Sequence, residues 1–100
     1  MNVTNDGLEH VAERHFDTTV NASQFTISES DLANILQRRE KVSTSVSRVI
    51  EISDGLRYMR EIIVRRVIGA DKFNNFEPTS ILNVVADEYV NLVSAFPGGL

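Results

Sequence analysis

The fold prediction for this chain depends on residues 28–52, which read SESDLANILQRREKVSTSVSRVIEI. Ser28 followed by Asp31 forms an acidic version of a capping box, and Ile27 can pack on Leu32, so a helix is predicted to begin at residue 29. Apolar residues then recur three and four positions apart, which places them on one helix face. They are Leu32, Ile35, Leu36, Val42, Val46, Val49 and Ile50. This spacing predicts a helix over residues 29–52.

One position on this apolar face is occupied by Arg39, within the polar run Gln37–Lys41. If the helix is continuous, Arg39 must reach solvent, pair with a carboxylate or contact a partner protein, because an unpaired buried charge is too costly. If the helix breaks at the polar run, residues 32–33 belong to a first short helix and residues 42–52 form a second. The two interpretations lead to different functions.

In the second interpretation, residues 42–50 (VSTSVSRVI) resemble the recognition helix of helix-turn-helix repressors. A Val-Ser start and a Val-Ser-Arg close are common in that family, after a Leu-Ala pair in the preceding helix. The segment between the helices is longer than the usual tight turn and contains no glycine. The resemblance implies a DNA-binding regulator that reads the major groove. The residues that would contact DNA are Arg38, Arg39, Lys41, Thr44, Ser45 and Arg48.

Three further helices are predicted, over residues 6–16, 54–68 and 79–95. Asp6 and Glu9 can form a capping box for the first, and Gly69 can end the third as a left-handed cap. Residues 17–27 and 69–78 lose the helical period and are predicted as loops, with Phe73 and Phe76 filling the core or, alternatively, exposed on a partner surface. The sequence therefore predicts an all-α, compact four-helix domain with two irregular loops.

A single long helix over residues 29–69 is the alternative to a break at Ser53–Gly55. Five apolar residues are spaced by seven through this region, namely Ile35, Val42, Val49, Leu56 and Ile63. A seam of this kind usually pairs with another chain, so homo-oligomerisation is compatible with the pattern.

The composition indicates one domain and a cytoplasmic location. The chain has 100 residues, 42% of them hydrophobic, and no cysteine. Disulfides and thiolate metal sites are thus excluded, and we expect neither a signal peptide nor a membrane contact. Net charge is −4, but residues 38–72 carry nine basic and five acidic side chains, whereas the two ends are acidic. A basic middle between acidic ends fits either solvated helix faces or a charged binding surface.

The first predicted helix carries a line of carboxylates opposite its apolar face. They are Asp6, Glu9, Glu13 and Asp17, at most four residues or about 6 Å apart along the axis. The simpler interpretation is an ordinary solvent face with acids near a helix N-terminus. The sharper one is a partner-binding surface, used together with Arg39. His10 and His15 do not share a face; His15 lies with the apolar residues and is predicted to be a packed histidine with one hydrogen-bond partner.

No sequence motif for catalysis is present. There is no glycine-rich phosphate loop, no nucleophile elbow and no zinc signature, so we expect no catalytic residue, no metal and no cofactor. The predicted function is a small non-catalytic protein-binding module, an adaptor or inhibitor that occupies the surface of another protein. In the sharper version of this prediction, that protein belongs to a complex that handles nucleic acid. The helix-turn-helix regulator, with nucleic acid as its partner, is the alternative.

Overall fold

The computed structural model describes residues 2–37, 46, 48–53 and 55–98, which form a mixed α/β fold with antiparallel sheets. In chain order the elements are α1 (Asn5–His15), β1 (Gln24–Phe25), α2 (Glu29–Gln37), β2 (Arg48–Ile52), β3 (Gly55–Ile63), β4 (Gly69–Asp71), the short 3-10 helix η1 (Lys72–Asn74), β5 (Glu77–Thr79), β6 (Ile81–Asp87) and β7 (Leu92–Pro97).

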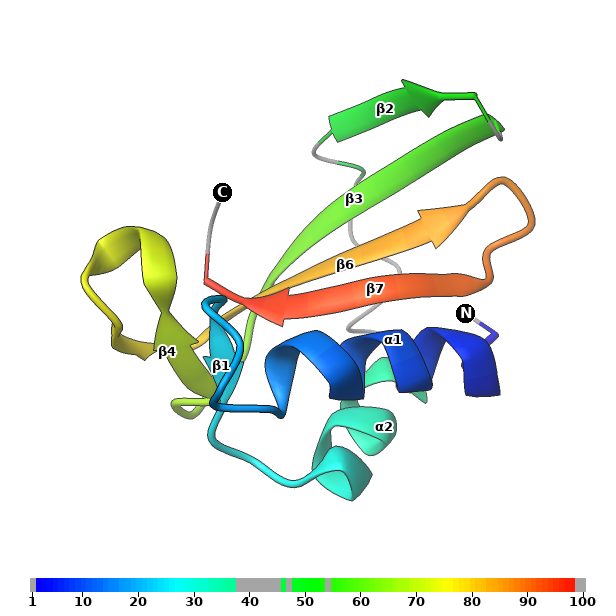
Figure 1. Cartoon of the computed structure of the whole chain (residues 1–100). Coiled ribbons are helices and arrows are strands. Elements are labelled where there is room, and N and C mark those ends of the chain that lie inside the picture. The colour runs from blue at the N-terminus through cyan, green and yellow to red at the C-terminus, as the bar shows by residue number, and fades with distance from the viewer. Residues whose placement is uncertain (1, 38–45, 47, 54, 99–100) are drawn as a thin grey trace.

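The larger sheet has the strand order β2-β3-β6-β7, and every neighbouring pair is antiparallel. Figure 1 shows α1 alongside β7, α2 beyond it, and β2 at the opposite edge of the sheet. The register places Ile62 beside Leu82, so both side chains emerge on the same sheet face. These side chains and Ala95 of β7 form one buried cluster with Leu32 and Leu36 of α2. The core therefore lies between this sheet face and the two helices.

A smaller sheet joins β1, β4 and β5 at one end of the molecule. Gly69 allows its close packing, because an added Cβ would overlap the Gln24 carbonyl oxygen and the Pro97 ring. The loops predicted over residues 17–27 and 69–78 are therefore only partly irregular. A strand as short as Gln24–Phe25 carries no recognisable signal, and only its pairing with β4 defines it.

The predictions for the first helix and for the start of the second are confirmed. The predicted span 6–16 corresponds to α1, although Thr4 rather than Asp6 caps it, with its side-chain oxygen 3.0 Å from the Gly7 N–H that donates to it. Ser28 caps α2 as predicted, since its hydroxyl accepts from the Asp31 N–H at 3.1 Å. Local capping and spacing were sufficient for both elements.

The predicted all-α fold is wrong, because the third and fourth predicted helices are strands. Residues 54–68 contain β3, and residues 79–95 contain β6 and most of β7. In β3 the buried Ile62 alternates with Ile63, which is 73% exposed, as in a strand with two different faces. Residues 79–95, the fourth predicted helix, are rich in apolar side chains, a feature that also fits buried strands.

The predicted recognition helix is also wrong where the structure describes it. Residues 48–52 form β2, paired with β3 from Arg48 opposite Met59 to Ile52 opposite Gly55. The break predicted at Ser53–Gly55 therefore separates two strands rather than two helices. The single long helix over residues 29–69 is excluded for the same reason.

None of the helices in the described part of the chain is long and apolar enough to cross a membrane.

Candidate functional site

The first candidate site is a cleft of about 220 Å³ where the end of α1 meets η1 and β7. We call it the His15 cleft. Its lining consists of Arg14, His15, Asn21, Ala22, Ser23, Lys72, Phe73 and Phe96. These residues come from four segments, namely the end of α1, the loop that follows it, η1 and β7. Only the first two segments are neighbours in the sequence.

Hydrogen bonds between side chains and the backbone hold the loop after α1 against η1. The Ser23 hydroxyl accepts from the Lys72 N–H at 2.9 Å, and the Lys72 ammonium donates to the Asn21 carbonyl at 3.0 Å. Asp17 holds the beginning of the loop, since its carboxylate accepts from both the N–H and the hydroxyl of Thr19. The two hydrogen bonds of Lys72 hold the segments that form one side of the cleft, the loop after α1 and η1, against each other.

His15 is buried at the base of this cleft, and its tautomer follows from its contacts. Its Nδ1 lies 2.7 Å from the Ser23 carbonyl oxygen. Because a carbonyl can only accept, Nδ1 carries the proton in the neutral ring and Nε2 keeps a lone pair. The rings of Phe25 and Phe96 lie 6.3 and 5.9 Å from the imidazole ring, measured between centroids. The predicted packed histidine with one hydrogen-bond partner is confirmed.

Burial is the main reason that the pKa of His15 lies below its usual value of 6.5. The hydrogen bond to Ser23 opposes this shift, and the positive charges of Arg14 and His10 add to it. His15 is therefore neutral at pH 7, with an unprotonated Nε2.

Two cations and an exposed ring complete the cleft. Arg14 is exposed, and within the described residues no carboxylate lies at salt-bridge distance from Arg14 or Lys72. Phe73 is 67% exposed, with the Lys72 ammonium 5.7 Å from its ring centroid. The prediction that Phe73 and Phe76 fill the core is wrong, because both rings lie at the surface.

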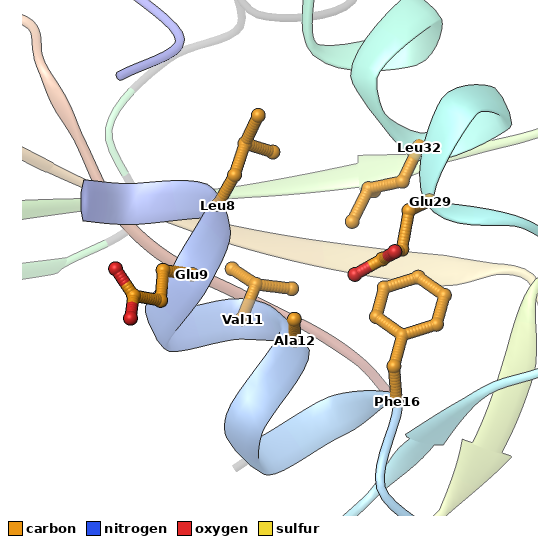
Figure 2. Close-up of a pocket in the computed structure, with 7 residues that line it drawn as sticks. All are labelled: Leu8, Glu9, Val11, Ala12, Phe16, Glu29 and Leu32. Atoms are coloured by element: carbon orange, nitrogen blue, oxygen red, sulfur yellow. The ribbon is translucent and has the colours of Figure 1, made fainter. Parts of the chain in front are cut away.

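The second candidate site is a groove of about 210 Å³ between α1 and α2, which we call the helix groove (Figure 2). Its lining consists of Leu8, Glu9, Val11, Ala12, Phe16, Glu29 and Leu32. Figure 2 shows the Glu29 carboxylate beside the Phe16 ring, whereas the Glu9 carboxylate points away from α2; the other lining residues are apolar. All charge in the lining is therefore negative.

The predicted partner-binding residues are only partly gathered at this groove. Asp6, Glu9, Glu13 and Asp17 are all exposed, as the solvent-face interpretation requires, but only Glu9 lines the groove. Of the predicted DNA-contacting residues, Arg48 is exposed on the edge strand β2. Arg38, Arg39, Lys41, Thr44 and Ser45 lie outside the described residues.

Sequence reasoning missed Ser23, Lys72 and Glu29 as site residues. Ser23 and Lys72 are 49 positions apart, and only the meeting of the loop with η1 joins them. In the regions that the structure describes, no group of three or more His, Asp or Glu side chains converges as a metal site would require.

The chain matches no protein-family model, no curated protein and no solved structure. Its function therefore has to be inferred from the geometry of these two sites.

Proposed function

We propose that the His15 cleft binds single-stranded RNA and that His15 acts there as the base that cleaves it. The observation that carries this proposal is the fixed tautomer of His15, whose neutral, buried ring keeps a lone pair on Nε2 and lines the same cleft as Arg14 and Lys72. A buried histidine with one nitrogen bound to a carbonyl is the arrangement that general bases use, because the bound nitrogen orients the free one.

The two cations favour a phosphate group as part of the ligand. Arg14 and Lys72 come from different segments and line the same cleft, so we expect one phosphate to interact with both. Arginine offers paired N–H donors and lysine a compact charge, and both are common phosphate ligands. The overall charge of −4 does not oppose this, because binding depends on the local field of the cleft.

Phe73 favours a nucleobase next to that phosphate. An exposed ring beside a cation provides a stacking surface, and proteins that bind single strands combine such rings with basic grooves. The cleft of about 220 Å³ is smaller than a typical ligand pocket. It therefore suits one nucleotide unit of a strand that continues over the surface.

The chemistry follows from these positions. His15 Nε2 takes the proton of the ribose 2′-hydroxyl, whose oxygen forms a bond to phosphorus while the bond from phosphorus to the next 5′-oxygen breaks. The departing oxygen takes a proton from water, and His15 returns its proton to solvent. Arg14 and Lys72 stabilise the charge that gathers on the phosphate oxygens. The products are a 2′,3′-cyclic phosphate and a 5′-hydroxyl.

This proposal departs from the expectation of a non-catalytic chain. That expectation rested on the absence of sequence motifs, whereas the His15 cleft is assembled by residues with no characteristic spacing. The protein-binding role stays a prediction and concerns the other site.

The test compares a labelled single-stranded RNA with a DNA of the same sequence, which lacks the 2′-hydroxyl. We expect the RNA to be bound and cleaved and the DNA to be bound only. With two cations involved, the logarithm of affinity should fall with the logarithm of salt concentration with a slope of about −1.4. His15→Asn keeps a donor for the Ser23 carbonyl but has no Nε2, so it should reduce cleavage roughly 10²- to 10⁴-fold and leave binding nearly unchanged.

Arg14→Ala with Lys72→Ala should weaken the binding of both strands, and Arg48→Ala with Arg65→Ala is the matched control, because both arginines are exposed and neither lines the cleft. Equal affinity of the cleft variant and the control would refute the phosphate site. Binding of RNA without cleavage would refute the role of His15.

A further inference from the structure

The helix groove is an apolar surface whose charged groups all have the same sign. Five of its seven lining residues are apolar, and the other two are Glu9 of α1 and Glu29 of α2. Neither carboxylate has a salt-bridge partner among the residues that the structure describes. A ligand that fills this groove must therefore combine an apolar stem with a positive end.

We propose that the helix groove docks a basic amphipathic segment of another protein, with one lysine or arginine side chain entering between α1 and α2. Such side chains bury their methylene stems against apolar surface and keep the charged end at the rim. Here the stem would contact Leu8, Ala12 and Phe16, and the charged end would reach Glu29, whose carboxylate lies beside the Phe16 ring (Figure 2).

The size of the groove agrees with one long side chain. Its volume of about 210 Å³ equals that of roughly seven water molecules at about 30 Å³ each. Beyond Cβ, a lysine or arginine side chain has only a few heavy atoms and fits within this space. A whole helix does not, so the remainder of the segment must lie along the surface.

The exposed acids of α1 continue the negative surface beyond the groove. Glu13 follows Glu9 by one helical turn and is exposed, and Asp17 lies just past the end of the helix. A segment anchored in the groove by one cation can therefore place further cations along α1. Charge complementarity of this kind selects a basic partner and repels an acidic one.

The experiment uses the whole chain and a labelled peptide in which leucine and lysine alternate with helical spacing. The controls are the same peptide with glutamate in place of lysine and a hexalysine peptide without apolar residues. Fluorescence anisotropy gives the affinities, and amide chemical-shift changes locate the contact. We expect the leucine–lysine peptide alone to bind well, with shifts centred on Leu8, Ala12 and Glu29.

Two variants separate the contributions of charge and shape. Glu9→Gln with Glu29→Gln should weaken binding about three- to tenfold, which is the range for two exposed ion pairs. Glu61→Gln with Glu77→Gln is the matched control, because both residues are exposed on strands away from the groove and should have no effect. Ala12→Met should fill the groove and abolish binding without removing any charge.

Three results would overturn the proposal. They are equal affinity of the groove variant and its control, equal binding of hexalysine, and shifts located elsewhere on the molecule. Self-association that Ala12→Met removes would identify a second copy of this chain as the occupant and would also overturn it. None of these outcomes depends on RNA binding, since the His15 cleft and the helix groove share no lining residue.

Discussion

Replacing Gly7 by alanine tests how α1 is held against the sheet. Gly7, Val11 and His15 are the buried residues of α1, four positions apart, so they form the stripe that faces β7. An added Cβ at Gly7 would overlap the backbone carbonyl oxygen of Leu92. That carbonyl has little freedom to move, because the neighbouring Leu92 N–H donates to the Asn2 carbonyl at 2.9 Å.

Two opposing contributions set the size of the effect. In an ordinary helix interior, alanine is more favourable than glycine by about 1 kcal/mol. Here α1 must move away from β7 to relieve the overlap, and overpacking of this kind costs about 1–3 kcal/mol. We therefore expect Gly7→Ala to lower the free energy of unfolding by up to about 2 kcal/mol.

Urea unfolding followed by circular dichroism measures this change directly. Asn34→Ala is the control, because Asn34 is exposed in α2 and its replacement gains helix propensity without any clash. The control should be as stable as the original chain or slightly more stable. If Gly7→Ala is also stabilising, the close backbone approach of α1 to β7 is refuted.

The other predictions concern individual contacts. Because burial lowers the pKa of His15 below 6.5, the unfolded chain binds the proton more tightly, so the stability contributed by neutral His15 is fully present above pH 6.5 and is lost as the pH falls through the folded-state pKa. In urea titrations, the stability difference between the original chain and His15→Asn should therefore stay constant above pH 6.5 and shrink below it, and a difference that does not change with pH would contradict the lowered pKa. Thr4→Ala removes the cap of α1 and should cost about 1 kcal/mol in the same assay, whereas a change near zero would mean that the hydroxyl is not the cap. Leu36→Ala removes a fully buried side chain and should cost about 2–5 kcal/mol; a cost below 1 kcal/mol would contradict its place in the core.

The helices could be predicted because their signals are local. Ser28 and Asp31 form one cap contact three residues apart, and the apolar stripe of α1 repeats every four residues. Each backbone hydrogen bond of a helix also joins residues four apart. A short window of sequence therefore contains both the pattern and the interactions that it describes.

The strands could not be assigned from the same kind of window, because two periods fit residues 55–63 equally. Leu56, Met59 and Ile63 have helical spacing, while Leu56, Tyr58 and Ile62 are spaced by even numbers of residues, as on one face of a strand. Abundant β-branched residues in residues 62–68 and 81–93 favour strands, but the helix prediction relied on the spacing alone. The pairing of Arg57 with Asp87, thirty positions away, decides between the two.

By itself, the sequence determined the first helix, the start of the second and the packed state of His15, since caps and spacing act over a few residues. Only the tertiary structure decided that the second half of the chain is a sheet and that Ser23, Lys72 and Phe96 meet around His15. The physical reason is that a strand satisfies its backbone hydrogen bonds with a distant segment, and no local pattern identifies which segment that is. The two candidate sites form where such distant segments, or two separate helices, pack together.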